Sequence, residues 1–220
     1  MSNTTTYPTR TQTPQPPFAY NEHEVTYTSL PSKNSLAGTL TTPCGNVPFP
    51  AVILVHGMGP HDRDYSMMGH KLFMVLADLL TQNGIAVLRY DKRGIGASTG
   101  DFNFDVTGKE LADDVKAGIA YLKSRSDINH KSIGLIGHSE GGSVAIEVAH
   151  TSPDLSFLVL MAPAVGTAAR HMALQALFQL NADGYPHSIR DLKLRTALLS
   201  IVLEESVADT ARTRMQEYAV

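Results

Sequence analysis

The sequence has a single cysteine and little net charge, and each of these shortages excludes a class of function. Cys44 alone can form neither an intrachain disulfide nor a cysteine-based zinc site. Its turn-rich surroundings are typical of an incidental loop thiol rather than a nucleophile. The formal net charge of −3 at pH 7 provides no basic field. We therefore expect neither nucleic acid nor an anionic membrane as a partner.

Long hydrophobic runs are also missing. The N-terminus has neither the basic start nor the apolar run of a signal peptide, and no apolar stretch is long enough to span a bilayer. These absences predict a cytoplasmic protein. The spacing of the nine histidines matches no zinc-binding signature, so we predict no metal site, and nothing in the sequence indicates a cofactor.

Composition divides the 220 residues into three parts. Residues 1–20 are rich in threonine, proline and glutamine, and they are predicted to be a disordered tail. Residues 21–165 alternate between apolar runs and helical patterns. They form the predicted core, which is long enough for one domain. Residues 166–220 are helical in composition and are predicted to form a helical cap.

The pattern of the core predicts an α/β fold. Two β-like runs at residues 24–28 and 36–41 predict a leading hairpin. Four later runs are apolar at nearly every position, as in strands buried on both faces; they cover residues 51–55, 85–88, 133–136 and 155–160. Helical spacing separates these runs, and Thr107 and Glu110 have the spacing of a capping box. Strands that alternate with helices predict a mostly parallel sheet covered on both faces, with ligands at the carboxyl ends of the strands.

The motif Gly137-His138-Ser139-Glu140-Gly141 joins the third of these runs directly to a helix. A sharp turn from strand to helix exposes a serine Oγ above the edge of the sheet, and the helix N-terminus favours negative charge beside it. The pattern predicts that Ser139 is a catalytic nucleophile. The alternative is a serine that caps the helix, which leaves the flanking glycines unexplained.

A glycine-rich loop at residues 56–60 follows the first long strand. Acyl transfer needs two N–H donors aimed at the developing oxyanion. We predict that these donors are the backbone N–H groups of Met58, in this loop, and of Glu140, after the nucleophile. A plain turn is the alternative for the loop. Asp62 and Asp64 adjoin it, where they would either contact substrate or form a solvated turn.

Three ordered motifs carry a resemblance to a known family: HGMGPHDRD at residues 56–64, RYDKRGIGAS at residues 89–98 and GHSEGG at residues 137–142. Together they resemble the α/β-hydrolase superfamily, and within it the bacterial carboxylesterases related to the serine-aminopeptidase-like hydrolases. The resemblance covers about residues 18–165. It implies a Ser-His-acid triad, hydrolysis of small-molecule esters through an acyl-enzyme, and a helical cap inserted after the sixth strand.

The second of these motifs is predicted to be structural. Gly94 and Gly96 permit a tight bend after the strand. We expect Asp91 to pair with Arg93 and to brace this bend, because ion pairs of this kind are commonly architectural.

The sequence after Ser139 departs from the family pattern. It contains one apparent sheet strand, at residues 155–160, so the later strands that carry the triad acid and histidine are not visible. His150, His171 and His187 follow the nucleophile, and none lies on a predicted strand-end loop. His187 is the candidate for a surrogate base, although an exposed turn histidine is favoured there. No acid and no base are therefore assigned.

Three hypotheses stay open. A carboxylesterase shortened at its C-terminus would keep Ser139 but would hydrolyse esters weakly. A natural short relative would serve as a catalytically inactive binding or regulatory module. An acyltransferase or thioesterase would use the same serine with another acceptor or substrate. In addition, an unpaired apolar edge at residues 155–160 predicts poor stability in isolation or self-association.

Overall fold

The computed structural model describes residues 10–102, 106–164 and 213. The chain divides into two compact units, Met1–Pro163 and Ala164–Val220, and the first contains all the elements that follow. Residues 1–9 of the predicted tail lie outside the described residues. The predicted cap also lies outside them except for Thr213, which is helical, so the cap remains a prediction. Residues 10–19 form turns and coil ahead of the first strand.

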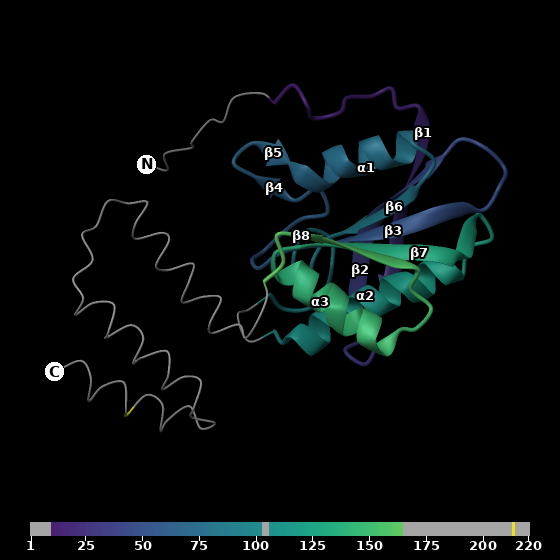
Figure 1. Ribbon diagram of the computed structural model, residues 1–220. Coiled ribbons are helices and arrows are strands. Elements are labelled where there is room, and N and C mark those ends of the chain that lie inside the picture. Colours follow the sequence, from purple (N-terminus) through teal and green to yellow (C-terminus); the bar gives the residue numbers. More distant parts are fainter. Residues whose placement is uncertain (1–9, 103–105, 165–212, 214–220) are drawn as a thin grey trace, which may run out of the picture. The chain divides into compact units, whose positions relative to one another are not determined.

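A six-stranded sheet forms the centre of the first unit, with the order β1-β2-β6-β3-β7-β8 (Figure 1). β1 and β2 are antiparallel and form the predicted hairpin, and β2 also pairs antiparallel with β6. The pairs β3–β6, β3–β7 and β7–β8 are parallel, as predicted. The strands are β1 (Tyr20–Thr28), β2 (Ser35–Pro43), β3 (Phe49–Val55), β6 (Ala86–Tyr90), β7 (Ile128–His138) and β8 (Phe157–Met161).

The central strands are apolar throughout because side chains on both of their faces are buried. Ile53 of β3 and Leu88 of β6 belong to one hydrophobic cluster, whereas Val52 and Val87, one position earlier, belong to another. Successive side chains of a strand point to opposite faces, so the two clusters lie on opposite sides of the sheet.

Within the described residues, three helices cover the sheet: α1 (Leu72–Gln82), α2 (Gly108–Lys123) and α3 (Glu140–Thr151). α1 packs on one face, and α2 and α3 pack together on the other (Figure 1). The predicted capping box is present, since the Thr107 side chain accepts a hydrogen bond from the Glu110 N–H and the Glu110 carboxylate accepts one from the Thr107 N–H. Gly84 follows α1 with φ of 90°, a conformation that favours glycine.

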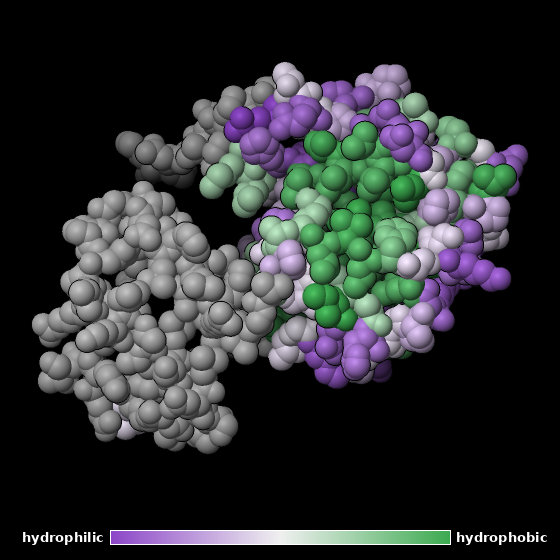
Figure 2. All heavy atoms as spheres, viewed as in Figure 1, coloured by the Kyte–Doolittle hydropathy of each residue, from purple (hydrophilic) through white to green (hydrophobic). Residues whose placement is uncertain are grey.

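β8 is the last strand of the sheet within the described part of the chain, and it pairs there with β7 alone. Phe157, Val159 and Leu160 are each at least 40% exposed. Figure 2 shows a broad hydrophobic area on the face of the molecule to which β8 belongs. The edge is apolar, as the sequence suggested, and self-association through it stays a prediction.

No helix within the described residues is long and apolar enough to cross a membrane. The same part of the chain contains no group of three or more histidine, cysteine, aspartate or glutamate side chains placed to hold a metal ion.

Candidate active site

Ser139 lies in the turn between β7 and α3, and its backbone has φ of 54° and ψ of −121°. A positive φ is unfavourable for a residue with a side chain and is commonly retained at functional sites. Ser139 occupies the N-cap position of α3, but its side chain makes no capping hydrogen bond. The turn is held instead through the backbone, because the Ser139 N–H donates to the Met161 carbonyl at 3.0 Å. The geometry is the sharp strand-to-helix turn that the sequence predicts for a nucleophile, and it is not that of a capping serine.

The glycines on either side of Ser139 allow backbones to approach closely. A Cβ atom on Gly137 would lie 2.3 Å from the Gly141 carbonyl oxygen, and one on Gly141 would lie 2.2 Å from the Val55 carbonyl oxygen. Any side chain at either position would therefore collide with main-chain atoms. The elbow, the start of α3 and the end of β3 pack directly against one another.

The glycine-rich loop after β3 lies beside Ser139. A Cβ atom on Gly57 would be 3.2 Å from the Ser139 Cβ, so this loop and the elbow are neighbours in space. The next peptide group, between Gly57 and Met58, carries the predicted Met58 donor. The Glu140 N–H belongs to the first residue of α3, where the helix itself offers no acceptor. The structure thus brings together the three residues from which the sequence predicts a nucleophile and an oxyanion hole.

Two side chains hold the Gly57–Met58 segment in place. Lys92 Nζ donates to the Gly57 carbonyl at 2.9 Å and lies 3.5 Å from a carboxylate oxygen of Glu140. His61 Nε2 donates to the Met58 carbonyl at 2.8 Å. Burial lowers the pKa of Lys92, although the neighbouring Glu140 partly opposes this effect. No local pattern in the sequence marks Lys92 as a residue of the site.

His56 stabilises the loop from the interior of the protein. Its side chain is buried, its Nε2 donates to the Asp62 carbonyl at 2.9 Å, and its ring packs against Phe73 and Tyr90. Burial, reinforced by the nearby charge of Lys92, lowers the pKa of His56 to about 3. His56 is therefore neutral near pH 7 and has a structural role.

Tyr65 is a site residue that sequence analysis missed. Its hydroxyl is hydrogen-bonded to His138 Nδ1 at 2.9 Å, and this histidine directly precedes Ser139. The Tyr65 side chain is buried and its φ is 55°. Nothing in the local pattern marks Tyr65, because the contact joins residues far apart in the sequence.

Asp62 makes its contacts within the loop, whereas Asp64 connects the loop to neighbouring residues. One Asp62 carboxylate oxygen accepts from the backbone N–H groups of Asp64, at 3.1 Å, and Ser66, at 3.0 Å. Asp64 forms ion pairs with Lys71, at 2.9 Å, and with the buried Arg89. Asp62 thus makes the contacts of a turn, which the sequence offered as the alternative to a substrate-facing role, whereas Asp64 is held in ion pairs with residues outside the loop.

The expected Asp91–Arg93 pair was wrong. Asp91 accepts hydrogen bonds from the Arg63 side chain at 2.9 and 3.2 Å and from the Ala97 N–H at 3.1 Å. Arg93 instead binds Asp114 of α2 through two bonds of 2.8 Å. β6 ends at Tyr90, and the chain then turns, so the two side chains face different neighbours. The loop is structural, as predicted, but its ion pairs connect it to other elements.

The triad histidine and acid are not assigned. Among the described residues, no histidine is hydrogen-bonded to Ser139 Oγ. His150 lies in the last turn of α3, whereas Ser139 precedes the first. His171 and His187 lie outside the described residues.

Residues 47–217 match the model of the family described as serine aminopeptidase, S33. The chain belongs to this family. Esterase EstD of Thermotoga maritima is 34% identical to this S33-family chain over 148 residues, which make up 67% of the chain and 34% of EstD. The polyketide transferase grgF of a Penicillium species is 26% identical, over 60% of the chain and 42% of the relative. The chain spans between a third and a half of the length of the curated relatives it matches.

Solved structures confirm the α/β-hydrolase fold of this S33-family chain. The Pyrococcus furiosus esterase Pf2001 superposes with a TM-score of 0.60 and 24% identity, over 76% of this chain and 57% of the esterase. The Penicillium α/β-hydrolase GrgF superposes with a TM-score of 0.59 and 22% identity, over 84% of this chain and 66% of that structure. Together with the family match and the identity to EstD, this fold confirms the predicted membership of the α/β-hydrolase superfamily.

Proposed function

We propose that the chain carries the nucleophile and the oxyanion hole of a carboxylic ester hydrolase that acts on small-molecule esters through an acyl-enzyme on Ser139. The observation that carries this proposal is the elbow at Ser139, with its positive φ, beside Gly57. Membership of a hydrolase family and the 34% identity to an esterase support it.

In the proposed reaction, Ser139 Oγ attacks the ester carbonyl, and the alcohol leaves as the acyl-enzyme forms. The N–H groups of Met58 and Glu140 donate to the oxyanion, and water then releases the acid. A general base has to take the Ser139 proton. Without one, the oxyanion hole and binding alone leave a rate enhancement of roughly 10³–10⁴ over water.

The test is hydrolysis of p-nitrophenyl acetate and butyrate by the wild-type chain, by Ser139→Ala and by Ser152→Ala. Ser152 follows the opposite end of α3 and serves as the matched control. We expect Ser139→Ala to abolish turnover and labelling by a fluorophosphonate, and Ser152→Ala to retain both. Undiminished hydrolysis by Ser139→Ala would overturn the proposal.

Two alternative functions can be tested with the same purified chain. A polyketide transferase and a thiohydrolase are among the relatives, which favours acyl transfer or thioester hydrolysis as the second candidate function. A higher kcat/KM for an N-acetylcysteamine thioester than for the matching ester would favour it. If the chain binds the ester but Ser139 does not react with it, the result would indicate a binding or regulatory module.

A further inference from the structure

A cavity of about 300 Å³ lies next to the nucleophile elbow, under a small hairpin that precedes α1. The hairpin consists of β4 (Ser66–Met67) and β5 (His70–Lys71). Most of the lining is apolar and comes from the hairpin and the first two turns of α1; it includes Met67, Met68, Leu72 and Val75. The volume is at the lower end of the range of ligand pockets.

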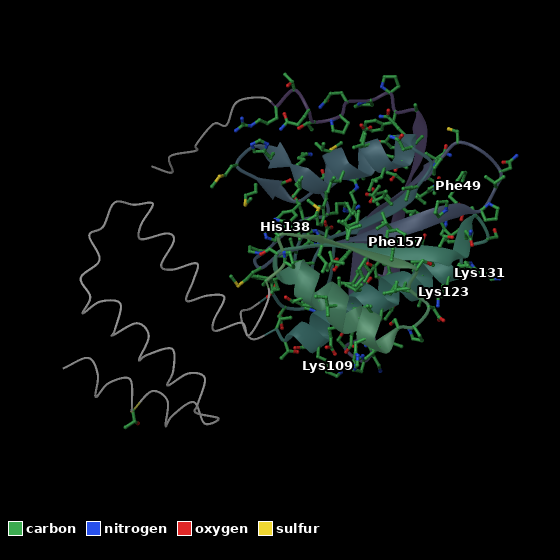
Figure 3. All side chains as sticks on the ribbon, viewed as in Figure 1. Phe49, Lys109, Lys123, Lys131, His138 and Phe157 are labelled. Atoms are coloured by element: carbon green, nitrogen blue, oxygen red, sulfur yellow. The ribbon has the colours of Figure 1, made fainter. Side chains whose placement is uncertain are left out.

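One end of the cavity reaches the elbow. Tyr65 and His138 both line it, and their side chains are hydrogen-bonded at 2.9 Å. The Tyr65 hydroxyl, His138 Nδ1 and the Ser139 Cβ all lie within 3.4 Å of the single point where a Cβ on Gly57 would stand. His138 is at the end of β7 that faces the hairpin (Figure 3). A molecule in the cavity would therefore extend from the immediate surroundings of Ser139.

The polar side chains in the wall are already paired within the protein. Gln12 Nε2 is 3.0 Å from His70 Nδ1, and Lys71 forms an ion pair with Asp64 at 2.9 Å. The Tyr65 hydroxyl and His138 Nδ1 are bonded to each other, as described above. The wall therefore offers a polar ligand few unpaired partners, and the site favours an apolar one.

The hairpin is built in an unfavourable backbone conformation. Met68 and Gly69, its two central residues, have φ of 50° and 77°, as a tight two-residue turn requires. Methionine in the left-handed region costs about 1 kcal/mol, and such residues cluster at functional sites. Met67 and Met68 are both more than half exposed, and flexible thioethers adapt to apolar ligands of varied shape.

We propose that this cavity binds the aliphatic chain of the ester substrate. The proposal rests on the proposed function, and it names the substrate class of the same site. Since an apolar cavity of roughly 150 Å³ accommodates benzene, a cavity of about twice that volume fits a chain of about six to ten carbons. Esters with such a chain should react with a higher kcat/KM than acetates.

The first experiment compares Val75→Phe, which fills the cavity, with Leu79→Phe, one turn further along α1. Leu79 is 59% exposed and lies outside the cavity lining. p-Nitrophenyl esters of two to twelve carbons test the acyl side, and acetates of four- to ten-carbon alcohols test the alcohol side. We expect Val75→Phe to lower kcat/KM for the preferred eight-carbon ester by 10-fold or more relative to acetate. The preference of Leu79→Phe should match wild type.

Two further measurements separate the outcomes. Val75→Ala, which enlarges the cavity, should move the optimum to longer chains, so the proposal stays testable if Val75→Phe does not fold. Octanoate, with acetate as control, can be titrated calorimetrically into Ser139→Ala, where no catalysis is required.

If no ester is hydrolysed but octanoate binds Ser139→Ala and not Ser139→Ala/Val75→Phe, the cavity proposal holds and the proposed function fails. If esters are hydrolysed with equal kcat/KM at every chain length, or if Val75→Phe and Leu79→Phe have the same profile, the cavity proposal is overturned and the proposed function stands.

Discussion

Lys92 donates to the carbonyl of Gly57, and that carbonyl belongs to the same peptide group as the N–H of Met58. A peptide group is planar, so a bond that fixes its C=O also fixes the direction of its N–H. The same ammonium group lies 3.5 Å from the Glu140 carboxylate. One buried charge thus connects the two residues whose N–H groups are proposed to hold the oxyanion.

Substitution of this lysine should lower turnover more than substrate binding. In Lys92→Met the Gly57–Met58 peptide group loses its anchor. Loss of a whole oxyanion donor costs roughly 10²–10³ in kcat, so we expect misalignment of one to lower kcat by about 10- to 100-fold with little change in KM. Steady-state kinetics on p-nitrophenyl butyrate give both constants. Lys109→Met, on the exposed surface of α2, is the control. An unchanged kcat in a folded Lys92→Met would contradict the role.

Stability should decline in mild acid because of His56. Its pKa is about 3 in the folded chain and about 6.5 when unfolded, so between these values only the unfolded chain takes up the proton. The free energy of unfolding is then lost as pH falls below 6.5, by up to about 1.4 kcal/mol per pH unit. Urea denaturation at pH 7.5 and 5.0 should differ by about 2 kcal/mol. His56→Phe should show a clearly smaller difference, and an equal one would exclude His56 as the cause.

The elbow glycine should not tolerate even a methyl group. In Gly137→Ala the new Cβ meets main-chain atoms at 2.3 Å, and overpacking of this kind costs about 1–3 kcal/mol. Gly108→Ala is the matched control, because a Cβ there has no neighbour within 4 Å. Thermal denaturation should show a lower Tm for Gly137→Ala and a Tm close to wild type for Gly108→Ala. Equal Tm values would mean that the elbow relaxes freely.

Two adjacent aspartates of α2 should differ widely in their contribution to the free energy of unfolding. Asp114 is buried with Arg93, and removing one partner of a buried pair costs about 3–5 kcal/mol. Asp113 pairs with Lys109 at the surface, where such pairs contribute about 0–1 kcal/mol. We expect Asp114→Ala to lower the free energy of unfolding in urea much more than Asp113→Ala. If both variants lost a similar amount of unfolding free energy, burial of the Asp114–Arg93 pair would not be what makes it stabilising.

The sequence predicted the features that depend on local pattern. Continuous apolar runs identified the buried strands, and the spacing of Thr107 and Glu110 identified a cap, because both signals lie within a few residues. The elbow at Ser139 was predictable because glycine spacing and strand context occur together. The start of β7 was less predictable, because its first residues, 128–132, do not form an apolar run.

Features that depend on contacts between distant segments were not predictable. The Asp91–Arg93 pair was wrong because the direction of each side chain after β6 is set by the turn and by the partners that surround it. The β4–β5 hairpin has strands of two residues, too short for any periodicity. Tyr65 reaches His138 across 73 positions of sequence, which no local pattern records.

The close packing between Gly141 and the end of β3 also has a consequence for hydrogen exchange. Because the start of α3 packs closely on the Val55 and His56 carbonyl groups, we expect the elbow and the loop after β3 to lose their packing together. Amides on either side should then exchange with solvent in one cooperative unit, with similar protection.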